Sequence, residues 1–203
     1  RQDMIWTAAP EKWEDGAFIG NGRMGAMIYR DPADGRMMLE LGRNDIYDNR
    51  DEEAEGAASL FTNERLPVGR LYLRLKGQMK SWKMRLDLWG AALCLSAETT
   101  AGSVAGEIFA CADRQLIAGQ FQTSGSERAE WEFVPAVSES PRQAYGIHHQ
   151  DPARIQKGCR PNPPARQWKE GDICFALQEL SRGAGIATAF RRAEEGKYLY
   201  LET

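Results

Sequence analysis

The sequence predicts an all-β protein: an antiparallel β-sandwich of the supersandwich kind, with short helices or none. Apolar and polar residues alternate with a period of two along most of the 203-residue chain, which is typical of strands with one buried face and one wet face. Turn signals separate these runs at short spacings, as in sandwiches. No apolar stretch keeps the helical period, and the best helical candidate, 52–60, is short and acidic. We expect roughly ten to twelve strands.

Each expected strand is a run with apolar residues at alternate positions. In order along the chain, the runs cover 24–29, 37–41, 71–75, 82–88, 93–99, 104–112, 131–133, 173–177, 186–190 and 198–201. The alternation assigns Trp82 and Trp131 to the core. It also assigns Ile173, Phe175 and Leu177 to the buried face of their strand.

One hairpin can be examined in more detail. Gly102-Ser103 lies between two strand-like runs and fits a glycine-first two-residue loop, which would set Cys94 opposite Cys111. A four-residue loop would instead set Cys94 opposite Phe109. The pairing of the two cysteines stays open, but a shift of two residues leaves every side chain on its own face. One face therefore takes Cys94, Phe109 and Cys111, and the other takes Leu93, Leu95, Ile108 and Ala110.

A long irregular segment is expected at 136–171, which contains five prolines and both histidines of the chain. Asn162-Pro163-Pro164 must be extended, because proline disfavours helix in the residue before it. A connection of this length is uncommon in a compact domain. Two interpretations stay open: an excursion that packs on a partner domain or borders a sugar site, and a surface loop without chemistry.

Composition excludes several classes of function. The chain carries 26 basic and 29 acidic residues and a net charge of −3, so no electrostatic signature of a nucleic-acid or membrane partner is present. No apolar segment is long enough to cross a bilayer. The four cysteines lack metal-ligand spacing, and we expect buried thiols, no metal and no cofactor.

No catalytic residue can be assigned. His148 and His149 are adjacent, so in an extended chain they point to opposite sides. No nucleophile-elbow sequence occurs. Gly20-Asn21-Gly22 is followed by strand-like residues rather than by a helix, which argues against a phosphate-binding loop.

A resemblance to a known family rests on the region around this turn. Trp13-Glu14-Asp15 precede the run Gly20-Asn21-Gly22-Arg23-Met24-Gly25-Ala26-Met27, and the order closely resembles the signature of glycoside hydrolase family 95, the inverting α-L-fucosidases and their relatives. Further matches are Leu66-Pro67-Val68-Gly69, Arg85-Leu86-Asp87-Leu88 and Glu107-Ile108-Phe109-Ala110. In that family these segments belong to an N-terminal β-sandwich, an architecture shared with family 65 phosphorylases.

The resemblance implies a non-catalytic domain. We expect residues 1–203 to form a single β-sandwich excised from a larger enzyme, whose (α/α)6 barrel carries the catalytic residues. The parent reaction would be α-L-fucosidase-like hydrolysis of a terminal glycosidic bond with inversion. The implied partners are that barrel and an oligosaccharide substrate. The implied location is secreted or periplasmic, with the signal peptide removed. The alternatives are an independent carbohydrate-binding module and a purely structural sandwich.

Polar residues gather at one predicted edge. A hairpin through Pro32-Ala33-Asp34-Gly35 brings the turn 21–23 beside the segment 42–50. The candidate ligand-binding or domain-interface residues there are Asn21, Arg23, Asn44, Asp45, Tyr47 and Asp48. The alternative for Asn44, Asp45 and Asp48 is turn chemistry, in which short polar side chains bond their own backbone.

Two tryptophans are further candidates for sugar binding. Trp89 breaks the register of its strand, and Trp168 falls in the irregular segment. Exposed aromatic rings complement the C–H face of a pyranose. The same exposure is equally expected at a domain junction.

Overall fold

The chain folds as the predicted all-β sandwich. The computed structural model describes residues 2–47, 65–136, 162–180, 185–193 and 197–203. These residues form fourteen strands in two antiparallel sheets, and one single-turn 3-10 helix, η1 (Trp13–Asp15). The strand count exceeds the expected ten to twelve because short strands such as β1 (Met4–Trp6) carry too little sequence pattern to be recognised.

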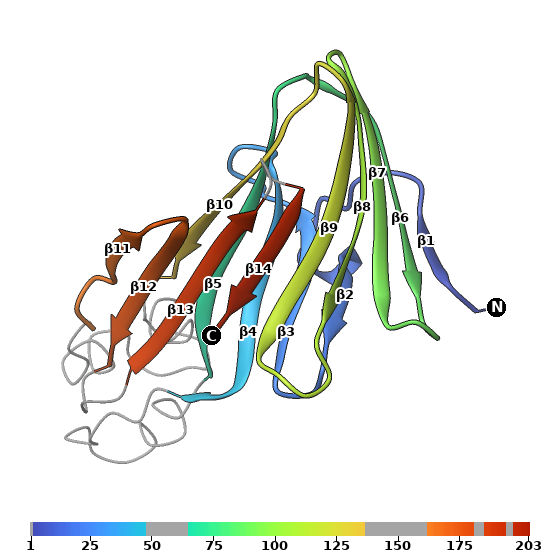
Figure 1. Cartoon of the computed structure of the whole chain (residues 1–203). Helices are drawn as coiled ribbons and strands as arrows, with labels where there is room; N and C mark the ends of the chain where they lie inside the picture. The colour runs from blue at the N-terminus through green and yellow to red at the C-terminus, as the bar shows by residue number, and fades with distance from the viewer. Residues whose placement is uncertain (1, 48–64, 137–161, 181–184, 194–196) are drawn as a thin grey trace, which may run out of the picture.

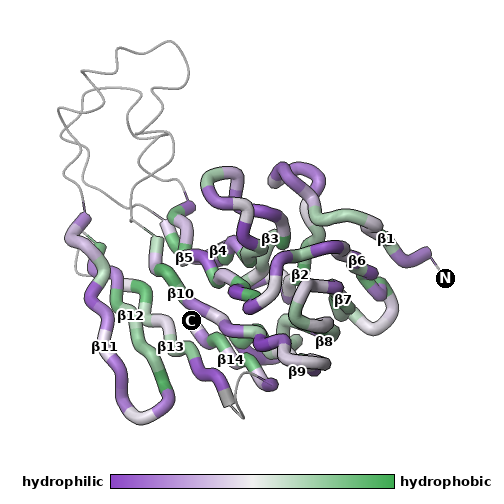
Figure 2. The backbone as a smooth tube through the Cα atoms, turned by 90° about the horizontal axis from the view of Figure 1, so that it is seen from above, coloured by the Kyte–Doolittle hydropathy of each residue, from purple (hydrophilic) through white to green (hydrophobic). Residues whose placement is uncertain are grey.

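The two sheets differ in size (Figure 1). The larger sheet has nine strands in the order β1, β6 (Met79–Asp87), β7 (Ala92–Thr99), β8 (Gly102–Ala110), β9 (Leu116–Gly125), β14 (Tyr198–Glu202), β13 (Gly185–Ala193), β12 (Ile173–Glu179) and β11 (Arg166–Glu170). The smaller sheet has five strands in the order β10 (Ala129–Pro135), β5 (Arg65–Leu75), β4 (Met37–Tyr47), β3 (Met24–Arg30) and β2 (Ala17–Gly20). Seen from above, β1 and β11 lie at opposite ends of the molecule (Figure 2).

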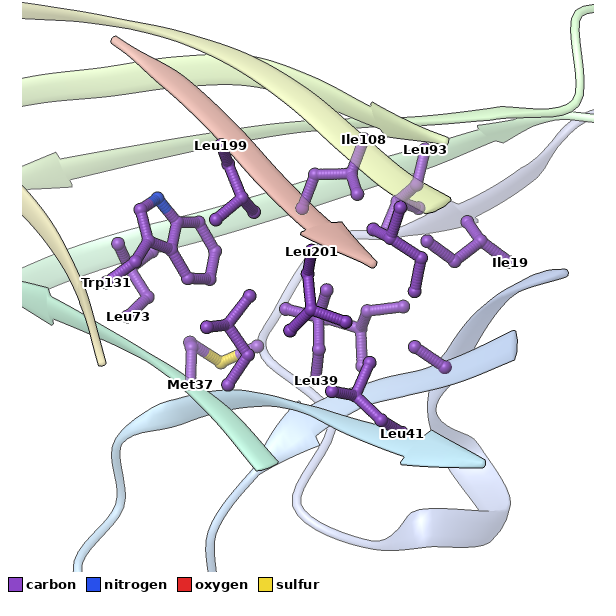
Figure 3. Packing of buried hydrophobic residues seen from close by; sticks show 14 of the residues in the cluster. Ile19, Met37, Leu39, Leu41, Leu73, Leu93, Ile108, Trp131, Leu199 and Leu201 are labelled. Atoms are coloured by element: carbon purple, nitrogen blue, oxygen red, sulfur yellow. The ribbon is translucent and has the colours of Figure 1, made fainter. Parts of the chain in front are cut away.

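The hydrophobic core fills the space between the sheets. Leu93, Ile108 and Leu199 of the large sheet point toward Met37 and Leu39 of the small sheet (Figure 3). All five side chains are buried. Alternate positions of most strands face this layer, which is the pattern that predicted the fold.

The two tryptophans assigned to the core are buried as predicted. Trp82 lies on β6 and Trp131 on β10. The ring of Trp131 lies 5.1 Å from that of Phe121 on β9. Leu88, predicted as the last inward residue of its strand, is instead exposed, because β6 ends one residue earlier at Asp87.

The register of the β7–β8 hairpin differs from both predicted alternatives. The chain reverses at Thr100-Ala101, and Cys94 lies opposite Glu107. The predicted division of side chains between the two faces is confirmed, since the shift is an even number of residues. Gly102 is not part of the loop. It lies in β8 with φ 147°, where a Cβ atom would collide with the carbonyl oxygen of Ser124 on β9. Cys94 and Cys111 are free thiols.

A buried carboxylate anchors this end of the sandwich. Glu127 accepts a hydrogen bond from the hydroxyl of Thr99 and from the backbone N–H groups of Lys76 (2.7 Å) and Gly77 (3.1 Å). Its side chain therefore holds the β5–β6 and β7–β8 turns together. These hydrogen bonds oppose the effect of burial, and the net result is that the pKa of Glu127 lies below its usual value.

The face prediction for residues 173–177 was wrong. Ala176 and Gln178 face the core, while Ile173, Phe175 and Leu177 lie on the outer face of β12. The large side chain of Phe190 on β13 pairs with Cys174 and fills the inner side. Periodicity cannot identify the core face when both faces carry apolar residues.

The predicted irregular segment 136–171 is shorter than expected. Residues 166–170 form β11, which pairs with β12. Asn162, Pro163 and Pro164 lie outside any regular element, as predicted. The rest of the segment, including His148 and His149, and the helical candidate 52–60 lie outside the described residues.

Candidate ligand groove

The outer face of the small sheet carries a row of residues with almost no side chain. The pairing sets Gly20 opposite Gly25, Gly25 opposite Gly42, and Gly42 opposite Pro67. These four residues, the floor row, cross β2, β3, β4 and β5 in one line. Larger side chains border this line on both sides, so a groove is left across the sheet.

One side of the groove is the Phe18 wall. Phe18, Met27 and Glu40 are successive cross-strand partners on β2, β3 and β4. Phe18 is 47% exposed. Trp13 of η1, 54% exposed, also lines the groove. The indole N–H of Trp6 donates to the carbonyl oxygen of Asp15 at 2.8 Å and so holds this single helical turn in place.

The other side is the arginine wall, formed by Arg23, Asn44 and Arg65. Arg23, just before β3, and Asn44, on β4, each lie four positions from the Phe18 wall, which corresponds to about 13 Å along the strands. The cavity between the walls has a volume of about 510 Å³. These dimensions suit a small or extended ligand lying across the strands.

Two glycines of the floor row have different roles. A Cβ atom on Gly25 would lie 2.8 Å from the carbonyl oxygen of Ile19, so no side chain fits there. A Cβ atom on Gly42 would meet nothing within 4 Å, and the backbone of Gly42 is outside the left-handed region. Gly25 is therefore required by the packing of the strands, whereas a side chain at Gly42 would point into the groove.

The side chain of Asn21 forms four hydrogen bonds within the protein. Its amide nitrogen donates to the carbonyl oxygens of Cys111 (2.7 Å) and Arg114 (2.8 Å) in the β8–β9 connection. Its side-chain oxygen accepts the N–H groups of Arg23 and Met24, both at 2.9 Å. The turn of the small sheet is thereby tied to the large sheet.

Asn44 and Asp45 form hydrogen bonds within this edge of the sheet. The side-chain amide nitrogen of Asn44 donates to the carbonyl oxygen of Gly22 at 2.5 Å. The backbone N–H of Asn44 donates to the carbonyl oxygen of Arg23 at 2.8 Å. Asp45 receives two hydrogen bonds from the guanidinium of Arg43, at 2.8 and 2.6 Å. This interaction holds the pKa of Asp45 below its usual value, and Arg23 contributes in the same direction.

The described carboxylate that lines the groove, Glu40, forms interactions with other side chains. Glu40 accepts a hydrogen bond from the hydroxyl of Tyr29 (2.6 Å) and an ion pair from Arg70 (3.1 Å). Burial and this bond to Glu40 raise the pKa of Tyr29. Asp31, which is not among the groove residues, accepts the hydroxyl of Tyr72 at 2.6 Å. Within the described part of the chain, Glu40 is the carboxylate that lines the groove, and it is held by Tyr29 and Arg70.

Arg23 and Arg65 differ from these groups. Both are exposed. In the described ranges, neither guanidinium forms a hydrogen bond or an ion pair with another residue. The arginine wall therefore presents two positive charges toward the groove.

The remaining predicted site residues lie elsewhere. Tyr47, at the end of β4, pairs with Arg65 and is 40% exposed, so it lies at the predicted edge. Trp89 is 91% exposed in the β6–β7 turn. Trp168 lies in β11, not in an irregular loop, and its ring stacks on Phe175 at 5.2 Å. Asp48 is outside the described residues.

Sequence reasoning missed Trp13, Phe18, Gly42 and Arg65 as members of one groove. The signal was present in the spacing, because the hairpin pairing of Gly20, Gly25 and Gly42 predicts a gap in the outer face once the register is known. The register itself depends on the β3–β4 connection, which contains more residues than a two-residue turn.

The site and the fold together define a β-sandwich with a polar and aromatic groove on its smaller sheet. No cluster of histidine, cysteine and acidic residues suited to a metal ion is found in the described ranges. No helix in this part of the structure is long and apolar enough to span a membrane. No protein-family model matches the chain, and no curated protein matches its sequence.

Proposed function

We propose that this chain is a non-catalytic β-sandwich domain of a glycoside hydrolase that acts on terminal glycosidic bonds, with α-L-fucosidase-like chemistry in the parent enzyme. In this proposal the domain packs against an (α/α)6 catalytic barrel of the same polypeptide. Its groove region contributes to saccharide positioning at the rim of the active site. The parent would be secreted or periplasmic.

One observation carries the proposal. Several of the residues that resemble the family 95 signature line the groove. Gly20 and Gly25 form part of its floor, Arg23 part of one wall and Met27 part of the other. The signature thus coincides with a concave, aromatic-lined surface, which is the kind of surface that binds small ligands.

The state of the carboxylates supports a non-catalytic role. Glycoside hydrolysis requires two carboxyl groups placed on either side of the scissile bond. Glu40 and Asp45 are instead held by Arg70 and Arg43. The groove can bind and orient a saccharide, while bond cleavage is left to another domain.

The test uses the 203-residue chain with aryl α-L-fucosides and other aryl glycosides. We expect no release of nitrophenol above background, together with saturable binding of fucosylated oligosaccharides measured by calorimetry. Phe18→Ala should weaken this binding, and Phe109→Ala, which alters a comparably exposed ring on the large sheet, should not. Turnover proportional to protein concentration would contradict the proposal.

An independent carbohydrate-binding module is the second candidate, and the exposed rings of Trp13 and Phe18 favour it. The coding sequence that follows the codon for Thr203 separates the two. A helical region of several hundred residues supports the accessory domain, and its absence supports the module.

A further inference from the structure

Two guanidinium groups of the arginine wall, those of Arg23 and Arg65, form no hydrogen bond or ion pair with another described residue. Arg43 is neutralised by Asp45, and Glu40 is neutralised by Arg70. Among the described residues, Arg23 and Arg65 therefore leave the groove with an excess of positive charge. Both residues line the groove, so both long side chains can reach a ligand that lies in it.

Asn44 belongs to the same wall as the two arginines. Its amide nitrogen donates to Gly22, and its side-chain oxygen accepts no hydrogen bond from another described residue. The wall thus offers two planar cations that match carboxylate geometry, together with one hydrogen-bond acceptor. This pattern fits a carboxylate flanked by hydroxyl groups.

We infer that the groove binds an anionic saccharide, an oligosaccharide that contains uronic acid residues. Its carboxylates pair with Arg23 and Arg65, a hydroxyl donates to Asn44, and a sugar ring lies against Phe18 and Trp13. The inference rests on the proposed carbohydrate function and assigns the ligand class of the same groove. An acidic peptide would satisfy the arginines equally, but the saccharide also accounts for the acceptor and the exposed rings.

The experiment compares short oligogalacturonides with the same oligosaccharides after chemical reduction of their carboxyl groups, using the 203-residue chain and calorimetry. We expect the acidic form to bind at least about tenfold more tightly, because hydrogen bonds to charged groups dominate. Arg23→Gln and Arg65→Gln should each lower the affinity for the acidic oligosaccharide about tenfold. Arg192→Gln, which alters an exposed arginine of the large sheet, should have no effect.

A second variant locates the binding. Gly42→Leu places a side chain in the groove without a close contact at Cβ, and it should abolish binding while the protein stays folded. Ala105→Leu on the exposed face of β8 is the matched control.

The outcomes separate the two proposals. Equal binding of acidic and reduced oligosaccharides, lost in Gly42→Leu, overturns the anionic assignment and leaves the accessory carbohydrate function standing. Equal binding of polyglutamate, lost in Arg23→Gln, overturns the saccharide in favour of an acidic peptide. Failure of every saccharide to bind overturns the inference and removes the support for carbohydrate positioning.

Discussion

Replacing Asn21 tests whether the turn of the small sheet depends on a tether to the large sheet. Asn21→Ala removes four hydrogen bonds. Those to Cys111 and Met24 are partly buried and each contribute about 1 kcal/mol, whereas the exposed bonds to Arg114 and Arg23 each contribute about 0.5 kcal/mol. We therefore expect a loss of about 3 kcal/mol in the free energy of unfolding.

Urea unfolding followed by tryptophan fluorescence measures this loss. With a slope of about 2 kcal/mol per molar urea, the midpoint should fall by about 1.5 M at unchanged slope. Asn44→Ala, which removes one exposed side-chain bond, is the control and should lose about 0.5 kcal/mol.

A further variant separates the tether from the local turn. Asn21→Asp keeps the acceptor for Arg23 and Met24 but sets a carboxylate against the carbonyl oxygens of Cys111 and Arg114. We expect it to be at least as destabilising as the change to alanine. A midpoint shift below about 0.3 M for Asn21→Ala would refute the reasoning and return Asn21 to the candidate ligand-binding groups.

Two other predictions concern charged side chains. Asp45→Ala should change the free energy of unfolding by no more than about 0.5 kcal/mol in a urea titration, because the Asp45 carboxylate is half exposed to solvent; a larger loss would identify Asp45 as a turn anchor that supports the less exposed Arg43. Glu127 has a lowered pKa in the folded state, so its contribution to stability is present above the unfolded value of about 4.3 and is lost as the pH falls through the folded value. Glu127→Gln should therefore be less stable at neutral pH and should show a smaller loss of stability on acidification to about pH 3, measured by unfolding midpoints at each pH; an unchanged pH dependence would contradict this account.

The period-two pattern was sufficient to predict the class of fold, because a sandwich needs one apolar face per strand. Leu93 and Ile108 were placed correctly on the inner face for the same reason. Phe175 was placed on the wrong face, since its outward ring is covered by Trp168 from a strand that the sequence did not reveal. Local pattern identifies which residues share a face, but only the partner strand decides which face is buried.

The candidate site was predicted in part. Arg23, Asn44 and Asp45 do lie at one edge, as the hairpin argument required. The side chain of Asn21 instead donates a hydrogen bond to Cys111, which follows β8 of the large sheet and lies 90 residues further along the chain. Contacts between the sheets depend on how they stack, and no local pattern records this.

The edges of both sheets have a consequence for how this protein meets a partner. The edge strands β1 and β2 are only three and four residues long. The edge strand β10 ends in Pro135, and β11 exposes Arg166, Lys169 and Glu170. Short, charged or proline-bearing edges are poor templates for strand addition. A second polypeptide is therefore poorly placed to add a strand to either sheet. We expect association to use the side chains on the broad faces of the two sheets instead.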